Sequence, residues 1–454
     1  MFLTRKNVDA TKGSILPLII VYATPLIIST LIQSLFNAVD IAVLSNMANA
    51  HAVASVGATT SIIHLILHTF VGLAAGAKLI LARQIGMQDT ESIHKTVSTS
   101  LITAVFVGII VAIVGVIYAP DFLRLTKCPA ECFDGAVLYT RIYLGAAPAI
   151  LIYNFGSSII TAAGDTQRPL YYILAGGVLN AVLNIILCLI LPEKVMAVAI
   201  ATASSQVLGS VLVILRLCKM DGDCNLDLKS IRFSWSAFGK LVRYGAPIAF
   251  NSALYPLANL QIQSAINSFG VAATAGCSAA TTIESVPSAF VTSFGTTASV
   301  FVGQNLGANK PDRVKKSFAL CILLGVVTAG IIGSALYLSG EFWLALLVDR
   351  DPDAISYGMI RMFYLCLFYF IVGANNSMTN TIQAYGYSSF TAILSIFSVL
   401  IFRIIWMHFV YPHFETFDNL MLCFLVSWIL VLAANIIALT IIMIRYKKGI
   451  FKKI

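Results

Sequence analysis

Long hydrophobic runs, separated by short charged or Gly/Pro-rich breaks, dominate the chain. A helix needs about 20 apolar residues to cross the roughly 30 Å hydrocarbon core of a bilayer, and the runs reach this length. They lack the ten-residue alternating segments that are typical of membrane β-barrels. The pattern therefore predicts twelve transmembrane helices, near residues 15–44, 52–80, 95–119, 136–163, 169–191, 195–218, 237–268, 273–303, 316–338, 355–385, 388–411 and 419–445.

The composition supports the same fold class. Of 454 residues, 59% are hydrophobic and only 11% are charged, compared with about 25% charged residues in ordinary soluble domains. So few charges could not cover the surface of a soluble protein of this size. We therefore predict an all-α integral membrane protein and exclude a soluble enzyme. The chain also lacks a GxxxxGK[ST] motif, so we do not expect it to hydrolyse ATP.

The basic residues predict the orientation. Most Lys and Arg residues precede the first run, follow the last one or lie in alternate loops, whereas the opposite loops contain only Arg124, Lys127, Lys194 and Arg350. The positive-inside rule then places both termini in the cytoplasm of a multi-pass protein of the cell (inner) membrane. The net charge of +9 is explained by this topology and by attraction to membrane lipid, so no nucleic-acid partner is required.

The two halves of the chain resemble each other at an almost constant offset. Matching segments are Tyr22-Ala-Thr-Pro25 with Tyr244-Gly-Ala-Pro247, Arg83-Gln-Ile-Gly86 with Gln304-Asn-Leu-Gly307, and Ile160-Thr-Ala-Ala-Gly164 with Ile382-Gln-Ala-Tyr-Gly386. Six spans separate equivalent segments, so the repeats are parallel and imply a pseudo-twofold axis along the membrane normal. We predict two six-helix lobes, residues 1–219 and 237–454, joined by a cytoplasmic linker at 220–236.

Polar residues inside the first lobe point to a cavity. Gln33, Asn37 and Asp40 share one helical face, and Asn180 and Asn184 are one turn apart in another span. Another polar face includes Gln206. A carboxylate at the centre of a membrane helix costs about 2.5–3.5 kcal/mol, so Asp40 requires a partner or a watery cavity. The amides could instead act only as hydrogen-bonding links between helices.

The second lobe contains a different set of polar positions. We assign to its substrate cavity Tyr255, Asn259, Glu284, Asn376 and Gln383, together with Gln33 and Gln206 of the first lobe. Glu284 could bind a coupling ion or a cationic substrate. It could equally form a buried ion pair with Arg361 or Arg403.

Three weaker patterns have structural explanations. Cys128 and Cys132 could form a disulfide in an oxidising compartment, although their short spacing disfavours it. His64 and His68 have the one-turn spacing of zinc ligands but no evident third ligand, so packing is favoured. Gly72 and Gly76 form a small-xxx-small pair, which is typical of close helix packing.

Several of these motifs resemble the multidrug and toxic compound extrusion (MATE) family over nearly the whole chain. The resemblance rests on Gln33-Ser-Leu-Phe-Asn37-Ala-Val-Asp40, Ala54-Ser-Val-Gly57, Gly72-Leu-Ala-Ala-Gly76, Ala162-Ala-Gly164-Asp165 and Phe301-Val-Gly-Gln-Asn305-Leu-Gly307-Ala308. It implies a twelve-helix antiporter that exports amphipathic, often cationic organic compounds in exchange for H⁺ or Na⁺. The bacterial branch with an acidic residue late in the first helix is the more similar one, and its acid corresponds to Asp40.

The resemblance implies a coupling-ion site at Asp40, with Asn180 in the family's position in helix five. Many relatives carry an Asp where this chain has Asn184, which leaves Asp40 as the sole carboxylate of the predicted coupling-ion site. We hypothesise that Asp40, held by Asn37, Asn180 and Asn184, alternates between a loaded and a free state. The only metal that we expect is Na⁺ at Asp40. We expect no cofactor, small organic molecules as substrates, and a monomer.

Three alternatives remain open at this stage. A lipid-linked precursor flippase could share the fold, but it would be expected to have a strongly cationic cavity, for which Arg361 and Arg403 are the chief candidates. A channel would conduct without a driving gradient. A membrane scaffold would tolerate the loss of every buried acid.

Overall fold

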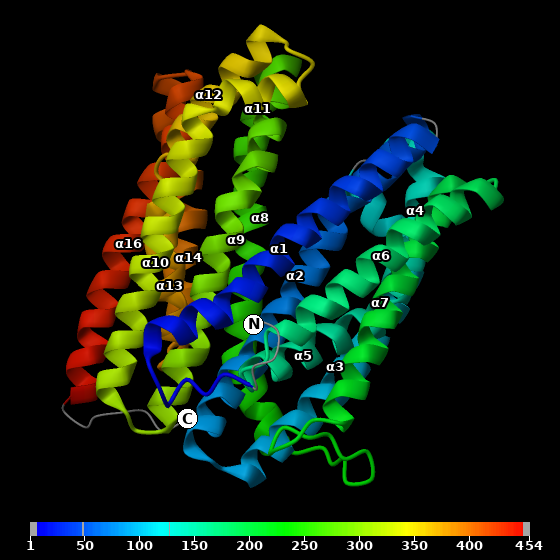
Figure 1. Cartoon of the computed structure of the whole chain (residues 1–454). Coiled ribbons are helices and arrows are strands. Elements are labelled where there is room, and N and C mark those ends of the chain that lie inside the picture. Colours follow the sequence, from blue (N-terminus) through cyan, green and yellow to red (C-terminus); the bar gives the residue numbers. More distant parts are fainter. Residues whose placement is uncertain (1–6, 48–49, 127, 448–454) are drawn as a thin grey trace. The chain divides into compact units, whose positions relative to one another are not determined.

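The structure, a computed structural model, describes residues 7–47, 50–126 and 128–447, with the backbone alone at several positions of three helices. The described residues form helices and no β-strand (Figure 1). The first half contains α1 (Ile15–Met47), α2 (Ala50–Met87), α3 (Thr90–Leu125), α4 (Ala130–Gly145), α5 (Ala147–Ala162), α6 (Gln167–Ile190) and α7 (Lys194–Cys218). The second half contains α8 (Trp235–Ser268), α9 (Val271–Gly307), α10 (Pro311–Leu338), α11 (Gly340–Leu347), α12 (Pro352–Leu365), α13 (Tyr369–Ala384), α14 (Ser388–Ser395), η1 (Ile396–Ile401), α15 (Phe402–Ile405), η2 (Trp406–Val410), η3 (Tyr411–His413) and α16 (Phe417–Lys447).

The helices agree with the predicted number of spans. Within the described part of the chain, nine helices are long and apolar enough to cross a membrane, and two bent pairs can each form one more span. The 34-residue helix α8 is also long enough, although polar residues interrupt it. The all-α membrane fold with twelve spans is therefore consistent with the structure.

Two predicted spans are broken in the middle. The predicted span 136–163 consists of α4 and α5, which are bent by 47°, and the span 355–385 consists of α12 and α13, which are bent by 45°. At the first break Pro148 occupies the first turn of α5. Proline has no backbone N–H to donate, so it favours the beginning of a helix over its interior.

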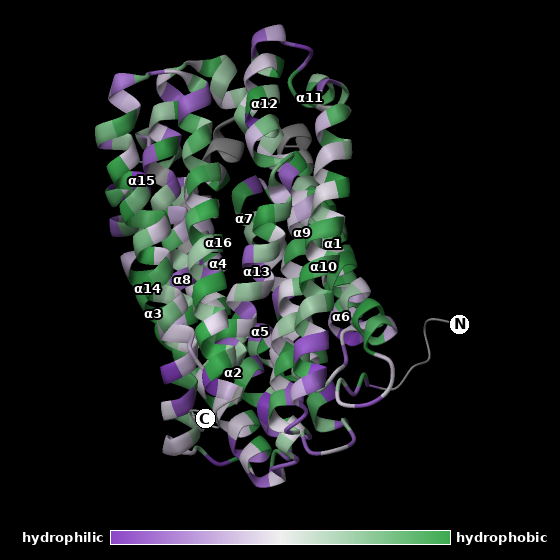
Figure 2. Cartoon of the chain, turned by 90° about the vertical axis from the view of Figure 1, so that its left-hand side faces the viewer, coloured by the Kyte–Doolittle hydropathy of each residue, from purple (hydrophilic) through white to green (hydrophobic). Residues whose placement is uncertain are grey.

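Apolar side chains cover much of the helix surface. Phe106 and Ile113 of α3 and Leu189 of α6 are exposed, whereas Phe155 and Ile159 of α5 are completely buried. Figure 2 shows hydrophobic residues along the middle of the helices and hydrophilic residues concentrated toward their ends. Such an apolar surface is stable in lipid, because the hydrocarbon core of the bilayer forms no hydrogen bonds with side chains.

The chain groups into two compact units. Unit 1 comprises Met1–Asp9 and Ile28–Ala249, and unit 2 comprises Ala10–Ile27 and Phe250–Ile454. The helices α1 and α8 each change from one unit to the other two residues after a proline, Pro25 and Pro247. The first part of α1 thus belongs to unit 2 and the first part of α8 to unit 1, in contrast to the predicted lobes 1–219 and 237–454. The lobe boundaries and the linker 220–236 stay a prediction.

The internal repeat is also present in the backbone. Gln88 and Asn309, which are 221 positions apart, have positive φ angles of 56° and 53°. Gly164 and Gly386, which are 222 positions apart, have φ angles of 92° and 91°. Left-handed residues are uncommon in L-amino-acid chains. Their recurrence at the offset of the sequence repeat shows that the two halves share local backbone structure.

Close packing in unit 1 depends on the predicted glycine pair. A Cβ atom added to Gly72 would lie 2.4 Å from the Cα atom of Ala249, and one added to Gly76 would lie 2.4 Å from the Cα atom of Gly245. Both neighbours belong to α8. Small residues allow the backbones of α2 and α8 to approach this closely. The predicted helix-packing role of Gly72 and Gly76 is therefore confirmed.

Unit 2 binds the segment that precedes α1 through backbone hydrogen bonds. Asn305 Nδ2 donates to the carbonyl oxygen of Ala10 (3.0 Å), and Gln304 Oε1 accepts from the amide of Ala10 (3.1 Å). Arg313 Nη2 donates to the same carbonyl oxygen (2.8 Å). The Gln304-Asn305 pair of the family-like motif therefore acts as a backbone-binding element in unit 2.

A buried ion pair joins α9 and α12 in unit 2. Arg361 Nε donates to Glu284 Oε1 (2.8 Å), and Arg361 Nη2 donates to Glu284 Oε2 (3.0 Å). Both residues are buried, and the Arg361 guanidinium lies 5.7 Å from the ring centroid of Phe424. Of the two partners predicted for Glu284, the structure shows Arg361. This bidentate geometry compensates for part of the cost of burying both charges.

We predict that Gly76→Ala destabilises the protein, because the added methyl group would overlap the backbone of α8. Overpacking of this kind costs about 1–3 kcal/mol. The measurement is the thermal unfolding temperature of the purified full chain in detergent. Gly239→Ala is the matched control, since a Cβ atom there meets nothing within 4 Å. An equal effect of both substitutions would contradict the close α2–α8 packing.

We also predict that Glu284→Gln lowers the unfolding temperature strongly, because it leaves the Arg361 charge buried without a counter-charge. Removing one partner of a buried pair costs about 3–5 kcal/mol. The double variant Glu284→Gln with Arg361→Met should recover much of this loss. Glu91→Gln is the control, because the Glu91–Lys95 pair is exposed and should contribute little. A double variant no more stable than Glu284→Gln would argue against the pair.

Candidate functional site

A polar cluster in unit 1 connects three helices. Asn184 Nδ2 of α6 donates to Asp40 Oδ1 of α1 (2.7 Å) and to Asn180 Oδ1 (3.1 Å). Asn180 Nδ2 in turn donates to Thr202 Oγ1 of α7 (3.3 Å). We refer to Asp40, Asn180, Asn184 and Thr202 as the Asp40 cluster. The structure thus brings together three of the four residues predicted for the coupling-ion site.

Local helix geometry explains how the cluster forms. Asn180 and Asn184 are four positions apart in α6, so their side chains lie next to each other on one face. The Phe36 ring occupies the space where a Cβ atom of Gly177 would lie, with ring carbons about 2 Å from that point. Because only glycine leaves this space free, α1 approaches α6 closely enough for Asp40 to reach Asn184.

The hydroxyl group of Thr202 is oriented by its own helix. Thr202 Oγ1 donates to the carbonyl oxygen of Val198 (2.9 Å), which leaves its lone pairs to accept from Asn180. Asn180 therefore donates toward α7, whereas Asn184 donates toward the Asp40 carboxylate of α1 and to Asn180 Oδ1. The negative charge of Asp40 is stabilised by the amide dipole of Asn184.

The electrostatic surroundings of Asp40 contain no paired cation within the described residues. The rings of Tyr139 and Tyr143 of α4 stack with centroids 5.9 Å apart, and both lie near enough to Asp40 to interact with its charge. Asp40 is half-buried. A carboxylate held only by neutral groups can change its charge state without leaving a basic residue unpaired.

One acceptor in the cluster has no partner. Asn184 is completely buried, and its Oδ1 atom forms no hydrogen bond in the structure. Buried acceptors of this kind are uncommon and call for an explanation such as an ion or a proton donor. Together with Asn180 Oδ1 and the Asp40 carboxylate, Asn184 Oδ1 supplies oxygen ligands, which hard cations prefer. Within the described residues, no group of three or more His, Cys, Asp and Glu side chains could hold a metal ion.

The remaining predicted residues of the first lobe lie outside the hydrogen bonds of the cluster. The Asn37 side chain falls outside the described residues. Gln33 is exposed and Gln206 is half-buried. Their assignment to a substrate cavity stays a prediction.

The predicted cavity residues of unit 2 take part in separate interactions. Glu284 pairs with Arg361, Asn376 Oδ1 accepts from Asn380 Nδ2 (2.9 Å), and Gln383 Nε2 donates to Thr391 Oγ1 (3.2 Å). Tyr255 and Asn259 are exposed on α8. Asn259 Oδ1 accepts a short hydrogen bond from Arg403. A shared substrate cavity of these residues likewise stays a prediction.

The sequence interpretation did not include Tyr139 and Tyr143 in the site. Their four-residue spacing places them on one face of α4, but this spacing is equally typical of packing. Nothing in a single sequence shows that this face is directed toward Asp40. Thr202 was one of several polar residues on its helix, and only the hydrogen bond from Asn180 distinguishes it.

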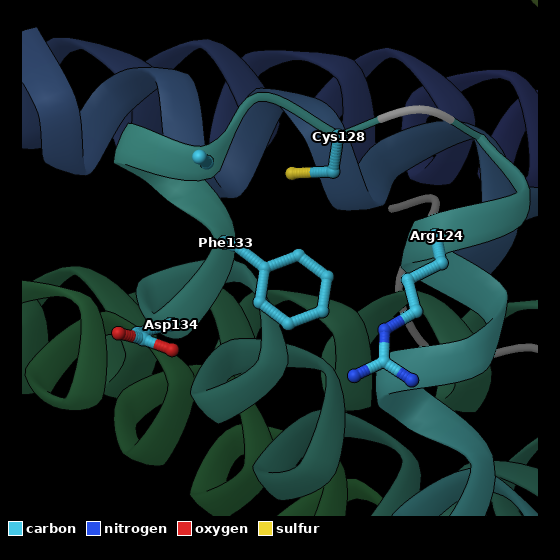
Figure 3. Close-up of a pocket in the computed structure, with 5 residues that line it drawn as sticks. Arg124, Cys128, Phe133 and Asp134 are labelled. Atoms are coloured by element: carbon cyan, nitrogen blue, oxygen red, sulfur yellow. The ribbon is translucent and has the colours of Figure 1, made fainter.

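A separate pocket lies where α3 meets α4 and is lined by none of the predicted site residues. It has a volume of about 410 Å³ and is lined by Arg124, Cys128, Ala130, Phe133 and Asp134 (Figure 3). The Arg124 guanidinium lies 5.9 Å from the ring centroid of Phe133. Cys128 and Cys132 are free thiols, and burial raises the pKa of Cys128. The side chains of His64 and His68 lie outside the described residues.

Comparison with known proteins identifies the family. The profile of the family described as MatE matches residues 25–186 and again residues 247–407. The two matches begin 222 positions apart, which is the offset of the internal repeat. Together they cover well over half of the chain.

The relatives cover most of the chain. A probable multidrug resistance protein, YoeA of Bacillus subtilis, is 24% identical over 398 residues, which is 86% of this chain and 85% of the relative. An FAD transporter of Shewanella oneidensis is 24% identical and covers 67% of this chain and 68% of its own length. The probable multidrug resistance protein NorM of Thermotoga maritima is 22% identical, with 88% and 85% covered.

Solved structures support the same fold. A MOP-superfamily transporter from Pyrococcus furiosus aligns with a TM-score of 0.87 and 21% identity over 97% of this chain and 99% of that chain. An outward-facing multidrug resistance MATE transporter gives a TM-score of 0.87 at 21% identity, with 98% and 99% covered. Members of this family are transporters rather than enzymes. The chain therefore belongs to the MatE family of multi-pass membrane transporters.

Proposed function

We propose that this protein is an antiporter of the cell membrane that exports amphipathic, often cationic organic compounds in exchange for H⁺ or Na⁺. Transport proceeds by alternating access, and both termini lie in the cytoplasm. The names of the relatives support the substrate class, since YoeA and NorM are probable multidrug resistance proteins. The family match favours this function over the lipid-linked precursor flippase, which we keep as the alternative.

The observation that supports ion coupling most strongly is the environment of Asp40. Its carboxylate receives a 2.7 Å hydrogen bond from Asn184 and has no cationic partner among the described residues. A permanent salt bridge would fix its charge, whereas an amide partner leaves it free to bind a cation. A half-buried carboxylate in a membrane helix also favours neutralisation by a bound ion.

Each coupling ion would change the same hydrogen bonds. A proton on Asp40 converts one carboxylate oxygen from an acceptor into a donor, and Asn184 Oδ1 is a buried acceptor without a partner. A sodium ion would instead bind carboxylate and amide oxygens of Asp40, Asn180 and Asn184. In both cases the Asn184 amide must adjust, which shifts α6 relative to α1. Loading thereby biases the helix packing within unit 1.

We predict that Asp40→Asn abolishes gradient-driven export while the protein remains folded. Asparagine keeps the shape of aspartate but cannot take up a proton or provide a negative charge. The assay is uptake of rhodamine 6G into sealed proteoliposomes under separately imposed H⁺ and Na⁺ gradients, which also identifies the ion. Asp121→Asn is the matched control, because Asp121 is an exposed carboxylate that pairs with Arg124. Unchanged transport by Asp40→Asn would refute the coupling role.

We further predict that Asn184→Asp increases the affinity of the site for Na⁺, because a second carboxylate joins oxygen ligands already in place. Ligand binding to the folded state stabilises it by mass action, so Na⁺ should raise the unfolding temperature of this variant by about 2 °C or more beyond its effect on the wild type. Choline chloride at equal ionic strength is the control. If Na⁺ stabilises both proteins equally, the ion does not bind at these oxygens.

A further inference from the structure

Unit 2 contains a buried arginine with neutral partners. Arg403 lies in α15 and is 2% exposed. Its Nη1 atom donates to Asn259 Oδ1, and its Nη2 atom donates to Ser427 Oγ (3.3 Å). The guanidinium carbon lies 4.5 Å from the ring centroid of Phe424, in range of a cation–π interaction. Its Nε atom is buried without a hydrogen bond.

The charge of Arg403 is not compensated by a carboxylate in the described part of the chain. Glu284, the other partner predicted for an arginine of this unit, is engaged on both oxygens by Arg361. Arg361 also lies against Phe424, so the group formed by Glu284, Arg361 and Arg403 has a net charge of +1. Ionisable residues inside a membrane are costly and are usually functional.

The partner of Arg403 on α8 is exposed. Asn259 is exposed, and so is Tyr255, which lies one turn before it and is close enough to Arg403 to interact with its charge. A molecule that contacts these two side chains can reach the guanidinium by displacing Asn259 Oδ1 as its hydrogen-bond acceptor. If an anionic oxygen replaced Asn259 Oδ1, the acceptor as well as the donor would be charged, which would strengthen the hydrogen bond.

The backbone around Arg403 provides an independent observation. The four-residue helix α15 lies between two π-helical segments, η1 and η2. π-helical turns are rare and, where they occur inside α-helices, are frequently found at functional sites. One such segment on each side of an unneutralised charge indicates that the position of this side chain is under functional constraint.

We infer that Arg403, with Asn259 and Tyr255, binds the anionic group of an amphipathic organic substrate, either a carboxylate or a phosphate. This inference rests on the proposed transport function and names a further substrate class for it. The planar guanidinium can present two N–H donors to either group. Phe424 packs against the guanidinium, and the exposed ring of Tyr255, on the same face of α8 as Asn259, offers contact for the organic body.

The test measures binding and needs no ion gradient. Fluorescence anisotropy compares fluorescein, an anion, with rhodamine 6G, a cation built on the same ring system, on the purified full chain in detergent. Arg403→Gln should weaken fluorescein binding by about tenfold or more and leave rhodamine 6G binding unchanged or tighter. Arg403→Lys keeps the charge but loses the planar fork, so it should retain part of the fluorescein affinity.

A second variant keeps the proposal testable if Arg403→Gln fails to fold. Asn259→Asp preserves the shape of the side chain and gives Arg403 an internal counter-charge, so it should abolish fluorescein binding and raise the unfolding temperature. Asn267→Asp is the matched control, since it adds the same charge on α8 and its Oδ1 atom already accepts from Gln263 Nε2 (3.0 Å). We expect this control to bind fluorescein like the wild type.

Competition distinguishes the two anion types. The competitor 2-naphthoate supplies a carboxylate and 2-naphthyl phosphate supplies a phosphate on the same apolar body, and the stronger competitor identifies the preferred group. The anion site would be overturned if Arg403→Gln lost affinity for both dyes equally. It would also be overturned if Asn259→Asp bound fluorescein with the affinity of the wild type. If the wild type binds fluorescein but shows no gradient-driven rhodamine 6G transport, the proposed transport function fails while the anion site stands.

Discussion

The constraint on which this structure depends is the cost of charge in an apolar environment. In unit 1 the Asp40 carboxylate is held by the Asn184 amide. In unit 2 Glu284 is neutralised by Arg361, while Arg403 is held by an amide, a hydroxyl group and an aromatic ring. The three arrangements differ in how far each charge is neutralised. In the ion pair the two charges neutralise each other, whereas Asp40 and Arg403 each retain a charge that a mobile ion or substrate can compensate.

The duplication clarifies which features serve the fold and which serve function. Left-handed residues recur at Gln88 and Asn309 and at Gly164 and Gly386, and both halves contain a bent helix pair. The charged positions do not recur. At the offset of 222, Asp40 corresponds to Ile262 and Arg403 corresponds to Ala181. The repeat has therefore kept the backbone features that shape each half, while the two halves have acquired opposite charges.

Much of the fold could be predicted from the sequence, because it depends on local patterns. Span length, the repeat and the close approach at Gly72 and Gly76 follow from hydrophobicity and residue size. The proximity of Asn180 and Asn184 follows from helix periodicity. In contrast, the choice of Arg361 over Arg403 as partner of Glu284 depends on how each helix is rotated in the packed unit. No pattern in the sequence predicts the π-helical segments beside Arg403.

The opposite charges of the two sites affect the energetics of the proposed cycle. A single carboxylate at Asp40 takes up one monovalent cation per cycle, so exchange for a monocationic drug moves no net charge. Export of a monoanion bound at Arg403 would instead combine with cation entry to move two charges. Each charge contributes about 2.3 kcal/mol per 100 mV, so an inside-negative membrane would drive anion export with about twice that energy. The same coupling site could therefore concentrate an anionic substrate far more strongly than a cationic one.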